Sequence, residues 1–270
     1  MIFIAGNTRQ QALRVGHQYL LKNKYPIINY AVESTKQGHT VTQEYLQLIK
    51  EIPNNKFSIA LKLSSFDFDI HKVSQIISSA QQKNIKVYLD AEQDVYHEDY
   101  QNFSTQLMFN YNSEQTTVLK TYQLYRWDSP KYLFKDLEIC SQNKYFFGAK
   151  LVRGAYWNTE QETGNLFLEK KDTDSNYNQA ILDMFAHPYP RKKIFLATHN
   201  KLSSEIGQTL SKKKNIFEFG HLQGMRENYY QQVSREYPVS VYIPYGPYRE
   251  MIPYLGRRLY ENIGILSTIF

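Results

Sequence analysis

The sequence has little or none of three features that assign many chains to a class at once. It holds one cysteine, Cys140, among 270 residues, which excludes an intrachain disulfide framework and a multi-cysteine metal site. We expect Cys140 to be a buried small hydrophobic residue. No G-x-G-x-x-G motif occurs, which argues against a Rossmann domain for a dinucleotide. No stretch approaches about eighteen consecutive apolar residues, the length of a membrane-spanning helix.

The N-terminus also lacks the basic start of a secretory signal, so the sequence predicts a cytoplasmic protein. The net charge of +6 leaves nucleic acid or an anionic membrane surface as partners to consider. The densest basic runs are only three residues long, at 191–193 and 212–214. Each precedes an apolar run, which favours solvated helix ends, and we expect no nucleic-acid partner.

Eight short runs of apolar, β-branched or aromatic residues recur along the chain, each about six residues long. Segments with helical periodicity lie between them, such as 42–52 and 70–80. This alternation predicts a (β/α)8 barrel of the TIM type, as a single domain over residues 1–270 with residues 1–16 as a lead-in helix or arm. The eight predicted strands are 27–32, 57–63, 85–91, 118–123, 147–152, 194–199, 216–222 and 239–245.

Polar side chains stand at nearly every predicted strand end, which is where the chemistry of such barrels gathers. Each has a structural explanation by itself: Asp90 could cap a turn and Lys62 could reach solvent. A purely structural barrel does not need so many of them. In chain order the ends carry Glu33, Lys62, Asp90, Gln123, Lys150, Arg153, Thr198, His199, Asn200, Leu222, Gln223 and Tyr242.

The last segment adds a group of residues that share one face if the segment is a helix. Tyr254 lies three and four residues before Arg257 and Arg258, so a phenol and two guanidiniums come together. Two guanidinium forks suit a carboxylate, and the ring can cover its carbon skeleton. The structural alternative is a surface ion pair between Arg257 and Glu261, contributing about 0.3–0.5 kcal/mol.

These strand ends resemble those of the proline dehydrogenase family, flavin-dependent barrels that oxidise L-proline. The resemblance runs from about Ile27 to Asn262 and keeps the family's order. It rests on ALKLS from Ala60, DAEQ from Asp90, TYQ from Thr121, KLVRGAYW from Lys150, LATHN from Leu196, FGHLQGM from Phe219, and YIPYGP with YLGRRLYEN from Tyr242 to Asn262.

The resemblance implies a role for each matching position. Arg257, Arg258 and Lys62 would bind the proline carboxylate, with Asp90 supporting Lys62. The pyrrolidine ring would be enclosed by Tyr156, Leu222, Tyr242 and Tyr254. Glu33 would be an acidic gate that pairs with Arg257 when the site closes. FAD would be held by Gln123, Lys150, Val152, Gly154, Trp157, Thr198, His199, Asn200 and Glu261.

Three positions depart from the family pattern. Lys150 stands where some members have Arg, Gly220 where some have Gln, and Asn29 where Asp is frequent. Lys150 still supplies a donor and a positive charge, whereas the flavin contacts near Gly220 are less defined. His199 is the donor best suited to the FAD pyrophosphate. We expect no metal, because no other histidine lies at ligand spacing beside it.

The expected reaction is hydride transfer from L-proline to FAD, which forms Δ1-pyrroline-5-carboxylate. A chain of 270 residues resembles the monofunctional members, so this product would pass to a separate pyrroline-5-carboxylate dehydrogenase. By resemblance, the electrons would go to a membrane quinone, with peripheral contact at the inner face of the membrane.

Three alternatives remain from the residues. Lys62 or Lys150 could form a Schiff base with a carbonyl substrate, as in barrel lyases that need no flavin. The barrel could instead be a non-catalytic binder of amino acids or membranes, a reading supported only by its charge. Within the same fold and cofactor, 4-hydroxyproline is the nearest alternative substrate.

Overall fold

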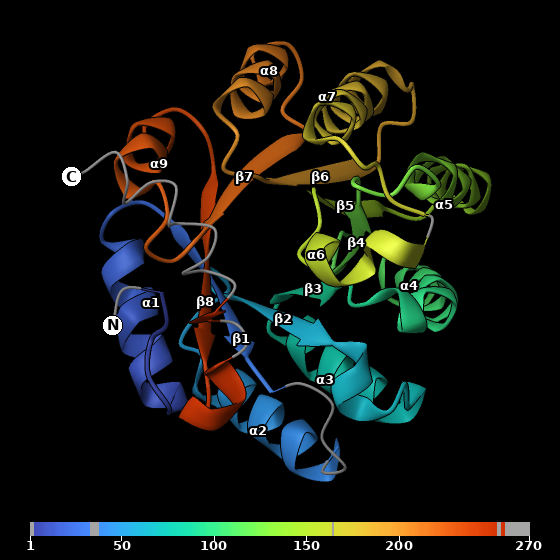
Figure 1. Ribbon diagram of the computed structural model, residues 1–270. Helices are drawn as coiled ribbons and strands as arrows, with labels where there is room; N and C mark the ends of the chain where they lie inside the picture. Colours follow the sequence, from blue (N-terminus) through green and yellow to red (C-terminus); the bar gives the residue numbers. More distant parts are fainter. Residues whose placement is uncertain (1–2, 33–37, 164, 253–254, 257–270) are drawn as a thin grey trace.

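The computed structural model describes residues 3–32, 38–163, 165–252 and 255–256. Eight parallel strands close into a barrel in the order β1 to β8, and Figure 1 shows them encircled by helices. The predicted (β/α)8 barrel is therefore confirmed. The strands are β1 Tyr25–Tyr30, β2 Ser58–Lys62, β3 Lys86–Asp90, β4 Val118–Gln123, β5 Phe147–Val152, β6 Lys192–Ala197, β7 Phe217–Leu222 and β8 Val239–Tyr245.

The helices of the described residues turn an apolar face to the strands. In α3, for example, Val73, Ile76 and Ile77 recur at helical spacing and are buried, while the Asp69 carboxylate caps the first turn. The helices are α1 Arg9–Leu20, α2 Gly38–Glu51, α3 Ile70–Gln82, α4 His97–Tyr111, α5 Ser129–Asn143, α6 Trp157–Glu160, α7 Lys170–Ala186, α8 Lys201–Ser211 and α9 Glu227–Val233, with 3-10 turns η1 Leu63–Phe66, η2 Asp94–Tyr96 and η3 Gln161–Thr163.

Strand bounds differ from the sequence prediction where polar or proline residues interrupt the apolar pattern. β1 begins at Tyr25 and ends at Tyr30, two residues earlier than predicted at both ends, because Tyr25 and Pro26 already pair with β8. β6 begins at Lys192, because its first two lysines pair with the start of β5. β6 ends at Ala197, two residues before the predicted end, so Thr198, His199 and Asn200 lie in the loop after it.

The core has two parts. A large layer of apolar side chains fills the space between the strands and the helices, and Cys140 lies buried, without a disulfide, on α5 as expected. A smaller cluster, which includes Ile27, Tyr88, Leu119 and Phe195, fills the barrel itself. These side chains pack inside the barrel, and a cavity lies at its carboxyl end.

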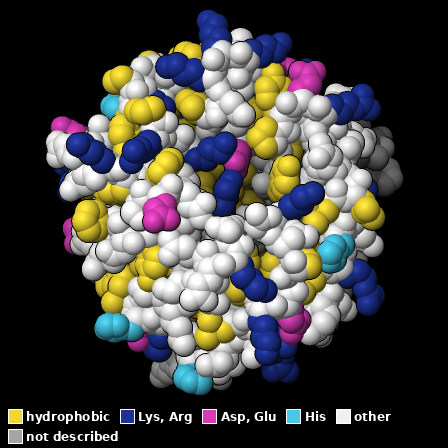
Figure 2. All heavy atoms as spheres, turned by 180° about the vertical axis from the view of Figure 1, so that it is seen from behind, with side chains coloured by type: hydrophobic (Ala, Val, Ile, Leu, Met, Phe, Trp, Pro, Cys, Tyr) yellow, Lys and Arg dark blue, Asp and Glu magenta, His cyan; other side chains and the backbone are white. Residues whose placement is uncertain are grey.

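The face behind the view of Figure 1 is formed by the loops that precede the strands, and lysine and arginine side chains are spread over it (Figure 2). Lys212, Lys213 and Lys214, ahead of β7, are exposed, as is Arg191 ahead of β6. Run 212–214 therefore lies at the exposed end of α8, as expected. The expectation is wrong for run 191–193, because Lys192 and Lys193 belong to β6 and Lys192 is buried. Among the described residues, no helix combines the length and apolarity that crossing a membrane requires.

Candidate active site

A cavity of about 520 Å³ lies at the carboxyl ends of the strands. Side chains from the ends of β2 to β8 line it, together with the loops after β5, β6 and β7. The predicted site residues that line it are Lys62, Asp90, Gln123, Lys150, Val152, Gly154, Tyr156, Thr198, His199, Asn200, Leu222 and Tyr242. The fold thus brings together residues that span 180 positions of sequence, from 62 to 242.

The Asp90 carboxylate links three strands across this cavity. Lys150 on β5 donates from Nζ to Oδ1 at 2.5 Å, and the Tyr242 hydroxyl on β8 donates to Oδ2 at 2.6 Å. The Lys150 ammonium also lies 5.2 Å from the centre of the Tyr242 ring, within reach of a cation–π interaction. The three side chains form one unit that we call the cavity triad.

Lys62 is the last residue of β2 and is the register partner of Asp90 on β3. Its loop is held by Glu92, whose carboxylate accepts from the Ser64 amide at 3.0 Å and from the Ser64 hydroxyl. Burial raises the pKa of Glu92, and the Ser64 hydrogen bonds oppose that rise. The expected support of Lys62 by Asp90 stays a prediction.

Gln123, at the end of β4, has its amide oriented by two acceptors. Its Nε2 donates to Glu92 O and to the Tyr125 hydroxyl, both at 3.3 Å. Tyr125 in turn donates to Glu160 at 2.6 Å. This series of hydrogen bonds fixes the side chain of Gln123, which the family resemblance assigns to FAD.

The segment after β5 curves around the cavity at Gly154. This glycine has φ +137°, and a Cβ there would lie 2.5 Å from the Tyr125 ring, so glycine is required for two reasons. Val152, Gly154 and Tyr156 line the cavity. The Trp157 indole N–H donates instead to Phe167 O at 2.9 Å, and the predicted contact between Trp157 and FAD stays a prediction.

The loop after β6 is held on both sides. The Asn200 side chain caps α8 by accepting from the Ser203 amide at 3.1 Å, and Arg153 donates to Thr198 Oγ1 at 2.5 Å. The Leu222 amide donates to His199 Nε2 at 3.2 Å. In the neutral ring that bond places the proton on Nδ1.

Gly220 lies on β7 where its neighbour across the cavity wall is Phe195. A Cβ at position 220 would lie 2.1 Å from the Phe195 ring. The aromatic ring therefore fills the space that a larger side chain would need, which accounts physically for the departure noted in the sequence. Leu222, two residues on, lines the cavity.

Five predicted site residues lie outside the described part of the chain, and their roles stay predictions. They are Glu33, Tyr254, Arg257, Arg258 and Glu261.

Other residues line the cavity without having been assigned to it from the sequence. Arg226 directly follows the FGHLQGM motif, and its position there was the one available signal. Lys170 and Glu250 also line the cavity, but neither belongs to a motif. Arg153 was noted only as a polar strand end; its guanidinium bonds Asp174, Thr198 and Ser203.

The cavity presents the donors that an anionic, hydrogen-bonding cofactor needs. Lys150 has a single hydrogen-bond partner among the described residues, Asp90, so its ammonium retains protons for a bound molecule. Thr121 Oγ1 is buried at the cavity wall, and the described residues offer it no partner. An unpaired buried hydroxyl is costly and invites a ligand atom or a water molecule. The residues present therefore fit FAD. Among the described residues, no cluster of three or more metal-ligating side chains occurs.

Comparisons with known proteins agree on one family. The family model described as proline dehydrogenase matches residues 9–269. The chain is 30% identical over 217 residues to mitochondrial proline dehydrogenase 1 of Dictyostelium discoideum, covering 73% of this chain and 38% of that protein. It is also 30% identical over 204 residues to the carbapenem antibiotics biosynthesis protein CarD of Pectobacterium carotovorum, covering 74% of this chain and 54% of that protein. The chain thus spans well under two thirds of these relatives.

Among solved structures, proline utilization A from Bdellovibrio bacteriovorus matches with a TM-score of 0.87 and 21% identity, over 96% of this chain and 32% of that one. A proline utilization A structure with proline bound in remote sites gives a TM-score of 0.82 and 22% identity, over 97% of this chain and 30% of that one. At such identities these matches support the barrel fold. The family match over nearly the whole chain goes further, and it shows that this chain belongs to the proline dehydrogenase family.

Proposed function

We propose that this protein oxidises L-proline to Δ1-pyrroline-5-carboxylate with FAD as the hydride acceptor. The observation that carries the proposal is the cavity triad at the barrel mouth, on the strand ends of a chain that belongs to the proline dehydrogenase family. When bound, FAD would supply the electron-pair acceptor. The protein supplies orientation and charge.

The residues divide into two groups around the cavity. Gln123, Lys150, Val152, Gly154, Thr198, His199 and Asn200 would hold FAD, with Trp157 and Glu261 as further proposed contacts. Lys62 would bind the substrate carboxylate together with Arg257 and Arg258. A buried carboxylate needs at least one such partner, because an unpaired charge in a closed site is prohibitively costly.

The described aromatic side chains suit a five-membered ring. Tyr156 and Tyr242 line the cavity beside Leu222, and they would exclude water from the reacting carbon. The Tyr242 hydroxyl is already engaged by Asp90. An added ring hydroxyl would be buried against the face of the Tyr242 ring, where an unpaired hydroxyl is costly, so the proposal favours proline over 4-hydroxyproline.

The downstream steps also belong to the proposal. The electrons would pass to a membrane quinone, and the product would be consumed by a separate aldehyde-oxidising dehydrogenase. The family match and the names of the proline dehydrogenase relatives support the choice of substrate class.

An absorbance spectrum recorded before and after anaerobic addition of L-proline tests the proposal. We expect the purified protein to carry non-covalent FAD and to lose its flavin absorbance on mixing. A protein that stays colourless after reconstitution with FAD would refute the flavin assignment. Covalent trapping of a lysine by borohydride with a carbonyl substrate would support the Schiff-base alternative instead.

A further inference from the structure

Two tyrosines, Tyr45 and Tyr100, lie where β2 stops pairing with β1 and where β3 stops pairing with β4. The pairing of β2 with β3 continues to their last residues, Lys62 and Asp90. The pairing of β3 with β4 ends at Leu89 and Lys120, although β4 continues to Gln123. On the other side, the pairing of β1 with β2 ends at Asn29 and Ala60. The tip of the β2–β3 pair is thus released from both neighbours.

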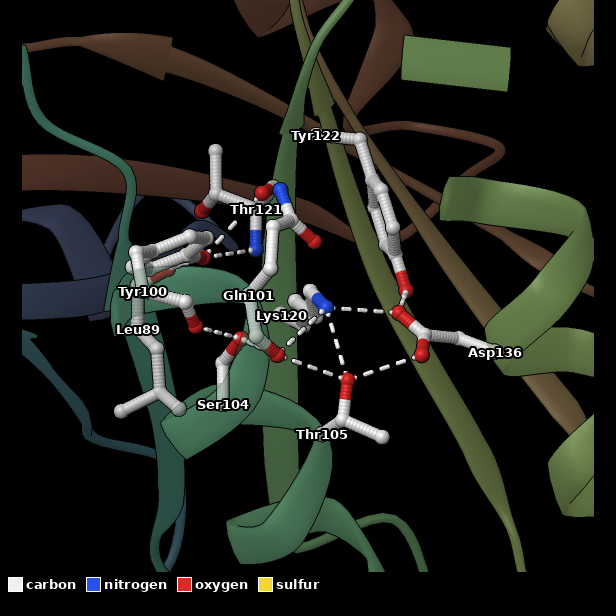
Figure 3. Close-up of polar contacts among 9 residues, drawn as sticks. All are labelled: Leu89, Tyr100, Gln101, Ser104, Thr105, Lys120, Thr121, Tyr122 and Asp136. Carbon is white, nitrogen blue, oxygen red and sulfur yellow. Dashed lines mark hydrogen bonds and ion pairs between the residues drawn. The ribbon is translucent and has the colours of Figure 1, made fainter. Parts of the chain in front are cut away.

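Tyr100 of α4 occupies the last rung between β3 and β4. Its hydroxyl accepts from the Thr121 amide at 2.7 Å and donates to Leu89 O at 2.9 Å, with Thr121 O at 3.1 Å (Figure 3). Tyr100 is buried, and burial raises its pKa well above the ordinary value. The phenol therefore stays neutral and can both donate and accept.

Tyr45 of α2 occupies the corresponding rung between β1 and β2. Its hydroxyl donates to Ala60 O at 2.7 Å and accepts from the Tyr30 amide at 3.2 Å. Tyr45 is also buried. Each tyrosine comes from the helix that follows the first strand of its pair, so the two sites are equivalent by topology. We call Tyr45 and Tyr100 the rung tyrosines.

The release of the β2–β3 tip matters at the cavity. Beyond Leu89, a continued ladder would pair Asp90 with Thr121 on β4. Instead, Asp90 reaches past β4 to Lys150 on β5 and across to Tyr242 on β8. Thr121 pairs with Lys150 on β5, and its hydroxyl at the cavity wall has no partner among the described residues.

We propose that Tyr45 and Tyr100 are positioning residues of the active site. Tyr100 bonds both β3 and β4 where their pairing ends, one residue before Asp90. Tyr45 bonds both β1 and β2 where their pairing ends, two residues before Lys62. The freed tip then presents both side chains to the substrate carboxylate and to the cavity triad. The part that names the substrate carboxylate rests on the proposed function; the part that concerns strand pairing does not.

Tyr100→Phe removes only the hydroxyl and is the direct test. The Thr121 amide and Leu89 carbonyl lose their shared partner, and we expect the ladder to extend to Asp90 and Thr121 in a crystal structure of the variant. Asp90 then moves away from Lys150. We expect KM for L-proline and Kd for a carboxylate-bearing competitive inhibitor to rise about tenfold, with kcat within about threefold.

Tyr177→Phe is the matched control. Tyr177 is fully buried on α7 and donates to Leu151 O at 3.0 Å, so within the described structure it bonds one strand rather than two. Its loss removes a similar hydrogen bond, but that bond does not join two strands, so we expect strand pairing to stay as it is. We expect inhibitor affinity within about twofold of the unmodified protein.

Tyr45→Phe tests the other side of the tip and covers the case that Tyr100→Phe does not fold. The proposal is overturned if pairing in either variant still ends at the original rung, Asp90 keeps both partners, and inhibitor affinity is unchanged. If the unmodified protein does not oxidise proline, the proposed function fails, while the crystal structures of the variants still decide the rung role.

Discussion

Two buried lysine–aspartate–tyrosine groups in this barrel have nearly the same local chemistry and different surroundings. In the cavity triad, Lys150 lies 2.5 Å from Asp90, which also accepts from Tyr242 at 2.6 Å. In a second group, Lys120 lies 2.7 Å from Asp136, which also accepts from Tyr122 at 2.7 Å (Figure 3). Each ammonium lies over the ring of its tyrosine, at 5.2 and 5.4 Å.

The difference is in what else each lysine can bind. The Lys120 ammonium also donates to Thr105 Oγ1 at 2.9 Å and Gln101 O at 3.2 Å, so its three protons have acceptors within the protein. Burial lowers its pKa, and Asp136 opposes that shift. Lys120 therefore joins β4 to α4 and α5, whereas Lys150 faces the cavity. Among the described residues, the two groups thus differ in how many acceptors the lysine has, and not in residue type.

The largest effect on this comparison should come from Lys120→Met. Asp136 would lose its cation while buried, and breaking such a pair typically costs about 3–5 kcal/mol. We expect a loss of that size in the free energy of unfolding, measured by denaturant titration, with proline turnover per folded molecule unchanged. Asp136→Asn in the same background should restore part of the stability. A loss below about 1 kcal/mol would show that the group of Lys120, Asp136 and Tyr122 does not stabilise the fold.

Lys150→Met should have the opposite effect, with a small loss of stability and a large loss of activity. Asp90 borders the cavity and keeps its bond to Tyr242, so we expect a smaller loss of stability than for Lys120→Met, below about 2 kcal/mol. The rate of flavin reduction by L-proline should fall about 100-fold, because a preorganised donor is removed from the reacting centre. Stopped-flow absorbance measures this rate. Lys150→Arg is the control that retains the charge and should stay within about tenfold; equal rates in Lys150→Met and the unmodified protein would contradict the assignment.

Arg257→Met and Arg258→Met test whether the cavity triad acts together with the predicted carboxylate site. Each variant should weaken a carboxylate-bearing competitive inhibitor by about 2 kcal/mol, or roughly thirtyfold in Kd. Calorimetry measures this affinity, and FAD content serves as the control because the residues proposed to hold FAD are unchanged. Unchanged affinity in both variants would place these arginines on the surface.

The smallest expected effect is that of Tyr242→Ser, which removes the tyrosine from the cavity triad and leaves the Lys120 group unchanged. The variant frees one oxygen of Asp90 and opens space beside it, so kcat/KM for proline should fall by about tenfold. The ratio of kcat/KM for trans-4-hydroxy-L-proline to that for proline should rise. Comparable turnover of both substrates by the unmodified protein would show that Tyr242 does not select between them.

Much of the site could be predicted because a barrel sends its strand ends to one place. Asp90 and Lys150 were assigned from their positions at the ends of apolar runs and from the motifs around them. Lys120 and Asp136 offered no such signal, since a lysine inside a strand reads as solvent-facing and an aspartate inside a helix as surface. Arg226 lay one residue beyond a motif, and the rung tyrosines read as ordinary core residues of their helices.

The sequence by itself determined the barrel, the order of its strands and the set of side chains at their ends, because apolar periodicity and strand-end position are local properties. Tertiary structure alone decided which lysine is sealed and which faces the cavity, and which tyrosines end a strand ladder. Those outcomes depend on partners that lie on different elements, from 11 residues apart for Tyr100 and Leu89 to 152 for Tyr242 and Asp90. Hydrogen-bond partners at such separations are set by packing between elements, which no local pattern records.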